Sequence, residues 1–482
     1  MSLRASAKSS LLWSSVDTLG VKAISFVVSI KLARILSPTD FGLVGLIVIF
    51  VSMGSILVDS GMGSSLIRDN EATDIDFDTV FYTNLGVSLI LYILLFIGAP
   101  FIGAFYEKLI LVDLIRVYGL SFIFSAFFVT QQSKMIKELQ FKKIAMLTMP
   151  STLISGLIAI AMAKLGYGVW SIIGLYLSSQ LLKSILIWYQ SEWKPSLQFS
   201  KERLAYHFNY GYKLVLSGML GVFTRELYSL VIGKKFDISS VGYYSRANSL
   251  KAYPVSIFGS IISKVTFPLL TKIKDDKEKI SLIYQRILKV SFFVMTAVMT
   301  TLIVIAEPLI LFLYTEKWSA AIPYFQIVAL AGILVPIHSF NLNIFRIYGR
   351  TDVLLKLSII KNVLVFFAVG VGVYFGIIGL LWASVGVSVI SLLINTSSSE
   401  EMINYKTMKQ LRDMGPIIGI GFVSYLLSMQ AMLIIDTEYN LAGIFLGAFI
   451  FISTFLGINF LFNTDSLKET IRMGRLLTLD KA

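Results

Sequence analysis

The stretch ARILSPTDFGLVGL, residues 33–46, has a counterpart in GKKFDISSVGYYSR, residues 233–246. In each stretch a cationic residue follows a long apolar run, small polar residues make a turn, and a glycine precedes the next apolar run. The glycines are Gly42 and Gly242, so the two turns are separated by 242 − 42 = 200 residues. A turn used twice at that distance indicates an internal repeat, and the rest of the sequence defines what is repeated.

The composition is that of a membrane protein. Of the 482 residues 56% are hydrophobic and 15% are charged, and the mean hydropathy is +0.78. Soluble domains carry about 25% charged residues. Apolar windows of about the 20 residues needed to cross a bilayer recur along the chain, whereas the alternating strands of a β-barrel are missing from the sequence. We predict an all-α polytopic membrane protein with about 14 transmembrane helices, and no cleavable signal peptide before the first span.

The net charge of +13 reflects membrane topology. Most Lys and Arg residues fall in the alternate loops that share a side with the N-terminus, and the positive-inside rule then predicts that both termini are cytoplasmic. Nucleic-acid binding is therefore not expected. Cysteine is absent, and His207 and His338 are the only histidines. These facts argue against disulfides and a metal site, and the short loops leave no room for a catalytic domain. We expect no enzyme activity and no cofactor.

The repeat predicts the domain organisation. An offset of 200 residues aligns the first two spans with the seventh and eighth, and an offset of 376 − 168 = 208 residues pairs Gly168 with Gly376. We therefore predict two six-helix lobes related by a pseudo-two-fold axis along the membrane normal, with two extra C-terminal helices. Such lobes support alternating access. The predicted parts are an N-terminal lobe (1–190), a cytoplasmic linker (191–210), a C-terminal lobe (211–398), a cytoplasmic connection (399–413), spans 13 and 14 (414–462) and a cytoplasmic tail (463–482).

Several stretches resemble a known family. LARILSPTDFGLVGL (32–46), DSGMGSSLIR (59–68) and TVFYTNLGVSLILYILLFIGAPFIGAFY (79–106) are similar to the N-terminal lobe of polysaccharide transporters of the multidrug/oligosaccharidyl-lipid/polysaccharide superfamily. QQSKMIKELQFKKIA (131–145) is similar to their first large cytoplasmic loop, with Lys137 where that pattern has arginine.

That family includes exporters of O-antigen, colanic acid and teichuronic acid units. The resemblance implies flipping of undecaprenyl-diphosphate-linked oligosaccharide repeat units across a bacterial plasma membrane, for surface polysaccharide or lipopolysaccharide biosynthesis. The implied partners are the lipid-linked oligosaccharide, the lipid bilayer, a coupling ion (H⁺ or Na⁺) and the polysaccharide polymerase machinery.

Two charges inside predicted spans are candidates for substrate binding, because intramembrane charges generally face the bundle interior. Lys22 belongs to a polar stripe on one face of span 1, and Arg225 lies in span 7. The repeat directs both toward one central cavity, where they would meet an anionic diphosphate. The alternatives are a structural Lys22 paired with Asp17 or a carbonyl group, and an Arg225 paired with Glu226, although adjacent residues diverge on a helix.

Carboxylates and outer cations complete the candidates. Asp17, Asp59 and Glu226 are candidate ion-coupling groups, with simple pairing of Asp17 or Asp59 to Lys22 or Arg68 as the alternative. Six cations at the outer mouth, in and beside the repeated hairpin, form either an anion-guiding rim or an ordinary solvated surface: Lys31, Arg34, Lys234, Lys235, Arg246 and Lys251.

Three classes of function remain open from the sequence. The first is the lipid-linked oligosaccharide flippase. The second is a drug/cation antiporter of the same superfamily, which would favour carboxylates over cations in its cavity. The third is a membrane-bound biosynthetic enzyme, which the missing catalytic loop disfavours.

Overall fold

A computed structural model of the chain describes residues 3–273, 276–435 and 441–479, and within them all regular structure is helical. By length and composition, twelve helices among the described residues could cross a membrane. The two remaining predicted spans fall on α1 (Leu3–Ile35) and α9 (Ile238–Lys272), which are 33 and 35 residues long. The all-α polytopic class is confirmed, while the count of fourteen spans stays a prediction.

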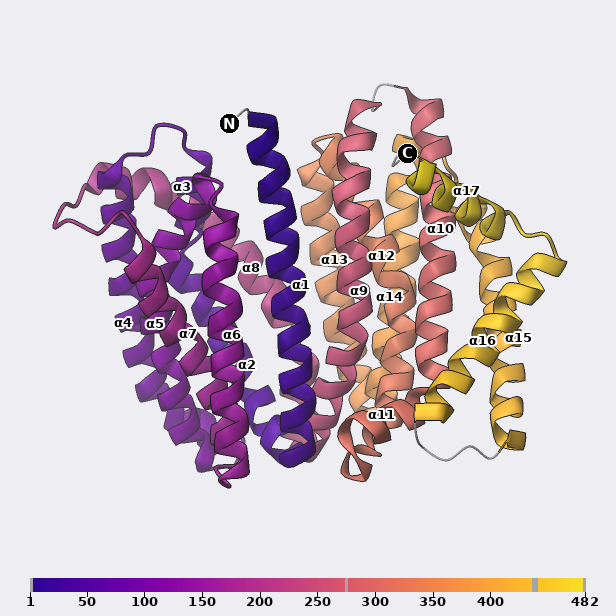
Figure 1. Cartoon of the computed structure of the whole chain (residues 1–482), viewed down its shortest axis with the longest axis horizontal. Coiled ribbons are helices and arrows are strands. Elements are labelled where there is room, and N and C mark those ends of the chain that lie inside the picture. Colours follow the sequence, from indigo (N-terminus) through magenta and orange to yellow (C-terminus); the bar gives the residue numbers. More distant parts are fainter. Residues whose placement is uncertain (1–2, 274–275, 436–440, 480–482) are drawn as a thin grey trace. The chain divides into compact units, whose positions relative to one another are not determined.

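The helices form two compact units, Met1–Gly242 and Tyr243–Ala482. In the N-terminal unit, α1 runs alongside α6 (Figure 1). The last helix, α8, belongs to this unit because it packs against α2, α3 and α4. After α1, the helices of this unit are α2 (Pro38–Asp59), α3 (Met62–Arg68), α4 (Asp74–Phe105), α5 (Ile110–Lys137), α6 (Phe141–Lys164), α7 (Trp170–Gln190) and α8 (Lys201–Lys235).

The C-terminal unit begins within α9. Its further helices are α10 (Lys277–Val304), α11 (Ala306–Tyr314), the 3₁₀ turn η1 (Glu316–Trp318), α12 (Ala321–Ile347), α13 (Thr351–Tyr374), α14 (Gly376–Ile403), α15 (Thr407–Ile435), α16 (Leu441–Leu461) and α17 (Asp465–Leu479). The two units are defined by contacts, whereas the predicted lobes are defined by the repeat, and the lobe boundaries stay a prediction. Of the predicted parts, residues 1–2, 274–275, 436–440 and 480–482 lie outside the described residues.

The sequence of the first repeated turn explains where α2 begins. Ser37 and Asp40 form a capping box, in which the backbone N–H of Ser37 donates to Asp40 Oδ2 over 2.8 Å and the Ser37 hydroxyl accepts from the Asp40 N–H over 3.2 Å. Pro38 occupies the first turn of the helix, where its missing N–H costs no hydrogen bond. The turn is therefore fixed by three short-range signals.

The two repeated turns pack on one another inside the N-terminal unit. A Cβ atom on Gly42 would collide with the carbonyl oxygen of Ile238, and a Cβ atom on Gly242 would collide with the carbonyl oxygen of Pro38. The contact is reciprocal, since 38 + 200 = 238 and 42 + 200 = 242. The glycines in the two stretches thus allow the first turn of α9 to approach the first turn of α2 at backbone distance.

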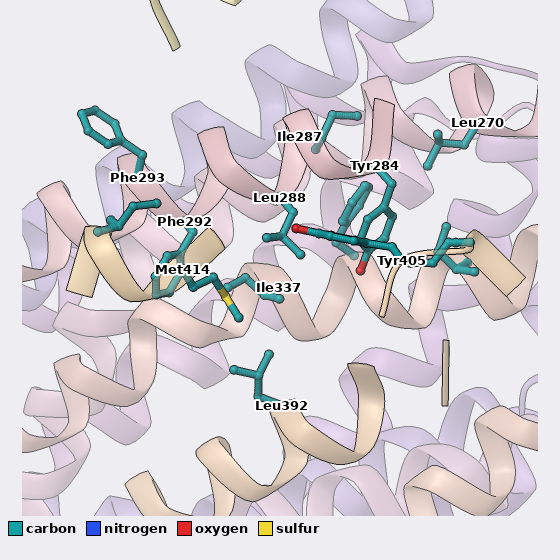
Figure 2. Packing of buried hydrophobic residues seen from close by; sticks show 14 of the residues in the cluster. Leu270, Tyr284, Ile287, Leu288, Phe292, Phe293, Ile337, Leu392, Tyr405 and Met414 are labelled. Atoms are coloured by element: carbon teal, nitrogen blue, oxygen red, sulfur yellow. The ribbon is translucent and has the colours of Figure 1, made fainter. Parts of the chain in front are cut away.

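The core of the C-terminal unit is built on α10. Figure 2 shows Tyr284, Leu288 and Phe292 of α10 gathered with Ile337 of α12 and Met414 of α15. Tyr284 is fully buried and its ring stacks on that of Phe340, with 4.5 Å between the ring centroids. α15 and α16, which the sequence predicts to lie outside the repeat, also pack against α10. The buried Phe455 of α16 packs against Phe293, with 5.0 Å between the ring centroids.

Large apolar side chains cover the outer faces of several helices. On α4, Ile90, Ile93, Leu94 and Ile97 are all exposed, and α13 likewise exposes Phe367. An exposed apolar surface of this extent is unstable in water and suits a hydrocarbon surrounding. The long helices therefore present the surface that a bilayer requires.

Candidate functional site

A cavity of about 360 Å³ lies within the N-terminal unit, between α2, α5, α7 and α8. Each helix presents to it residues three or four positions apart, which share one helical face. The lining residues with polar groups are Ser52 and Ser55 from α2, Tyr118 and Ser121 from α5, Tyr176 and Gln180 from α7, and Arg225 from α8. The volume falls in the range of small-molecule sites, about 300–1,000 Å³.

Arg225 is the charged side chain among the described residues that line this cavity. Its Nε pairs with Glu226 Oε1 at 3.2 Å. The pairing that helical geometry disfavours between adjacent residues is thus formed. The Arg225 side chain is nevertheless 62% exposed, whereas that of Glu226 is 18% exposed. The guanidinium group therefore keeps donors available for an anion.

One side of the cavity, which we call the inner wall, is formed by Ser55 of α2, Tyr118 and Ser121 of α5, and Tyr176 and Gln180 of α7. It is aromatic and polar. Tyr118 and Tyr176 stack with 5.4 Å between their ring centroids and 24° between their planes. Beside them, Ser121 Oγ and Gln180 Oε1 are buried and have no hydrogen-bond partner in the described structure. Buried polar atoms are nearly always satisfied in folded proteins, and at the cavity wall a ligand or water can supply the partner for these two.

Lys22, the second predicted cavity cation, lies half-buried on α1 in the same unit. The described residues that line the cavity beside Arg225 do not include it. On the same stripe, the Thr18 hydroxyl donates to the carbonyl of Ser14 over 2.8 Å, as polar residues do on apolar helices. A common cavity for Lys22 and Arg225 stays a prediction.

The two predicted ion-coupling aspartates are held by different neighbours. Asp17 accepts a hydrogen bond from the Thr148 hydroxyl of α6. Asp59 accepts from the backbone N–H of Gly63, and a Cβ atom on Gly63 would lie 2.7 Å from both Asp59 Oδ1 and Ser133 Oγ. Each carboxylate thus ties together two or more segments of the N-terminal unit, and a role in ion coupling stays a prediction.

Arg68, which the sequence offered as an alternative partner for the aspartates, has a different contact. Its guanidinium lies over the ring of Tyr210, 4.2 Å from the ring centroid. This cation–π contact joins the end of α3 to α8.

The predicted outer rim divides between the two units. Lys31, Arg34, Lys234 and Lys235 are exposed in the N-terminal unit, whereas Arg246 and Lys251 are half-buried in the C-terminal unit. Lys234 donates to the carbonyl of Phe105 over 2.6 Å and pairs with Glu107 at 3.2 Å. That cation anchors α8 to the end of α4, and the anion-guiding role of the rim stays a prediction.

Sequence reasoning missed a buried ionic network that joins α3, α4 and α8. His207 Nε2 lies 2.8 Å from Asp76 Oδ1 and its Nδ1 lies 2.9 Å from Ser65 Oγ. Arg203 pairs with Asp76 and, at 2.8 Å, with Asp69. His207 and Asp76 are almost completely buried.

The network contains the ligand types of a metal site, because atoms of Asp69, Asp76 and His207 lie within 4.8 Å of one another. The Arg203 guanidinium already supplies the positive charge that the two carboxylates need. We therefore interpret the cluster as an ion network that fixes the start of α8 against α4. Arg203 and His207 lie about 130 residues after Asp76 in the chain, so no local sequence motif reveals the cluster.

A second polar cluster, in the C-terminal unit, surrounds His338. Its Nε2 lies 3.1 Å from Ser388 Oγ and its Nδ1 lies 3.2 Å from the Asn395 amide. Lys361 of α13 interacts with it electrostatically. Lys361 is an intramembrane cation that is not among the candidates predicted from the sequence. Its position within a long apolar segment could have identified it.

The architecture and the polar cavity define a helical membrane protein of the kind that moves polar solutes. The family described as "Polysaccharide biosynthesis protein" matches residues 31–323. This match covers more than half of the chain, and the protein belongs to that family.

Curated relatives agree with this assignment. The chain is 24% identical over 432 residues to the lipopolysaccharide biosynthesis protein WzxC of Escherichia coli (strain K12), covering 89% of this chain and 85% of the relative. It is 26% identical over 346 residues to the teichuronic acid biosynthesis protein TuaB of Bacillus subtilis (strain 168), covering 70% and 71%.

Solved structures share the fold. The lipid II flippase MurJ in an inward closed conformation superposes with a TM-score of 0.75 at 17% identity, covering 95% of this chain and 100% of that one. An inward-facing multidrug resistance MATE transporter of the MOP superfamily gives 0.62 at 20% identity, covering 82% and 98%. The resemblance noted from the sequence is thereby confirmed at the level of family and fold.

Proposed function

We propose that this protein is a flippase that moves undecaprenyl-diphosphate-linked oligosaccharide repeat units across the plasma membrane of a bacterium by alternating access. The observation that carries the proposal is a polar, Arg225-bearing cavity in a member of the polysaccharide biosynthesis family. The relatives are named for lipopolysaccharide and teichuronic acid biosynthesis, and a structural neighbour is named a lipid II flippase.

The chemistry of the substrate explains the need for Arg225. A diphosphate that leaves headgroup water needs a counter-charge, since an isolated charge in a medium of low dielectric is costly. A guanidinium group offers planar, bidentate donors that fit phosphate oxygens. The 62% exposure of the Arg225 side chain leaves it accessible to such an anion, and we assign Lys22 as a second counter-charge.

Glu226 suggests how an ion would enter the cycle. Its carboxylate pairs with Arg225 at 3.2 Å. Binding of a coupling ion, H⁺ or Na⁺, at Glu226 would weaken this pair and make the guanidinium available to the diphosphate. Asp17 and Asp59 remain further candidates for binding H⁺ or Na⁺.

The drug/cation antiporter is the second candidate, and the cavity fits it less well. Antiporters of that kind would place carboxylates where cations bind, whereas the charged lining residue here, among those described, is an arginine. The likeness to the MATE structure, at 20% identity, shows a shared fold and does not extend to the substrate.

Surroundings and partners follow from the same proposal. The protein would lie in the inner membrane with both termini cytoplasmic and deliver its substrate to the polysaccharide polymerase machinery. The test is deletion of the gene followed by analysis of lipid-linked sugars. Accumulated undecaprenyl-linked repeat units and loss of surface polysaccharide support the flippase. Increased drug sensitivity with normal polysaccharide contradicts it and favours the antiporter.

A further inference from the structure

We propose that the inner wall of the α2–α5–α7–α8 cavity is a saccharide subsite, which binds an uncharged, hydroxyl-rich sugar of the substrate while Arg225 holds the diphosphate. This inference rests on the proposed flippase function and adds to it a division of the site into an anion part and a sugar part. It is carried by the hydrogen-bonding inventory, the aromatic pair and the charge distribution of the cavity.

The polar atoms of the inner wall call for a ligand that both donates and accepts hydrogen bonds. Ser121 is 4% exposed and its hydroxyl has no partner, and Gln180 Oε1 is likewise unsatisfied. The Ser55 hydroxyl donates to the carbonyl of Val51 over 2.8 Å and keeps its lone pairs for a donor. Each of these atoms can be satisfied by a sugar hydroxyl, which is a donor and an acceptor at once.

The same inventory favours a sugar over the diphosphate at the inner wall. Gln180 Oε1 and the lone pairs of Ser55 are acceptors, and an ionised phosphate oxygen has no proton to give them. The donors suited to an anion belong to Arg225, whose side chain is far more exposed than Ser121. The two kinds of group in the cavity thus match the two polar parts of a lipid-linked sugar.

The aromatic pair gives the subsite a surface for a sugar ring. Tyr118 is 5% exposed and stacks behind Tyr176, which is 41% exposed. An aromatic face packs well against the C–H groups of a pyranose, and a tyrosine brings a hydroxyl group as well. The cavity volume of about 360 Å³ suits a small-molecule ligand of this size class.

The experiment compares two probes on the full-length protein in lipid nanodiscs. One is the lipid-linked repeat unit extracted from the cell that makes it, and the other is undecaprenyl diphosphate without sugar. We expect Tyr176→Ala and Gln180→Leu each to weaken binding of the repeat unit about five- to ten-fold and to leave bare undecaprenyl diphosphate unchanged. Arg225→Ala weakens both probes. Tyr189→Ala, a change on the same helix at an 89% exposed tyrosine, is the matched control and alters neither.

The outcomes separate the two proposals. If Tyr176→Ala and Gln180→Leu weaken both probes equally, or neither, the subsite is overturned and the cavity wall is simply hydrated, while the flippase proposal stands. If the unmodified protein binds neither probe, the flippase proposal fails and the subsite fails with it. Thermal unfolding of each variant shows whether a loss of binding comes from a loss of structure.

Discussion

Gly42 and Gly242 lie in one reciprocal contact, in which each glycine faces the backbone carbonyl four residues before the other, at Ile238 and Pro38. Four positions linked by an offset of 200 residues therefore meet in one place within the N-terminal unit. Both positions require glycine because the facing atoms are backbone atoms, which cannot turn aside as a side chain can. A glycine in each of the two turns is thus required by the same contact.

The first prediction concerns this contact. Gly42→Ala or Gly242→Ala forces two helix starts apart and should destabilise the protein by about 1–3 kcal/mol, the usual cost of overpacking. Thermal unfolding of the purified protein in detergent measures the effect. Gly98→Ala on α4 is the control, because nothing beyond its own helix backbone and chain neighbours lies within 4 Å of the added methyl group. The change should be neutral or slightly stabilising. Equal behaviour of all three variants would disprove the close approach.

The second prediction concerns the ion network of α3, α4 and α8. Asp76→Asn removes the charge that pairs with Arg203 and lies 2.8 Å from His207. Arg203 and His207 then lose this partner. We expect the free energy of unfolding to fall by roughly 2–4 kcal/mol, below the full cost of breaking a buried pair because the Arg203 side chain is 31% exposed. The measurement is the same thermal unfolding experiment.

A surface ion pair provides the control for that network. Lys143 and Glu192 lie 3.0 Å apart with side chains 40% and 87% exposed. Lys143→Ala should cost no more than about 1 kcal/mol, as exposed pairs usually do. A larger loss from Lys143→Ala than from Asp76→Asn would contradict the interpretation of the network as a structural anchor.

Much of the fold could be predicted from signals within short stretches of sequence. The site could be predicted only in part, because it depends on contacts between residues that lie far apart in the chain. The capping box at Ser37 and Asp40, the apolar windows and the repeated glycines are each readable within a few residues. Tyr118 and Gln180 lie about 60 residues apart in the chain, and only the packing of α5 against α7 brings them to one cavity. Arg225 was predicted because an intramembrane charge is visible alone, whereas its uncharged neighbours resemble any other polar residue of a helix.

The third prediction concerns topology and rests on the distribution of Lys and Arg between loops. Both termini should be cytoplasmic by the positive-inside rule. Green fluorescent protein fused to the C-terminus should then be fluorescent, and alkaline phosphatase fused at the same place should be inactive. An active phosphatase would place the C-terminus on the outer side and would contradict the predicted topology.

The last prediction tests the role of Arg225 in transport. A charge-assisted hydrogen bond contributes roughly 1.5–3 kcal/mol, so Arg225→Ala should slow export of the repeat unit by about ten-fold or more at unchanged protein abundance. Arg225→Lys should recover part of the rate, because the charge survives and the bidentate geometry does not. The rate is measured as delivery of lipid-linked sugar to the outer leaflet of cells that express each variant.

The ion pair with Glu226 at 3.2 Å offers a competing explanation, in which Arg225 merely neutralises a carboxylate. The double variant Arg225→Ala with Glu226→Ala separates the two roles. If Arg225 only balances Glu226, removing both restores abundance and export together, since no uncompensated charge remains. If Arg225 binds the diphosphate, the double variant reaches normal abundance and still fails to export, because the anion has lost its counter-charge in the cavity.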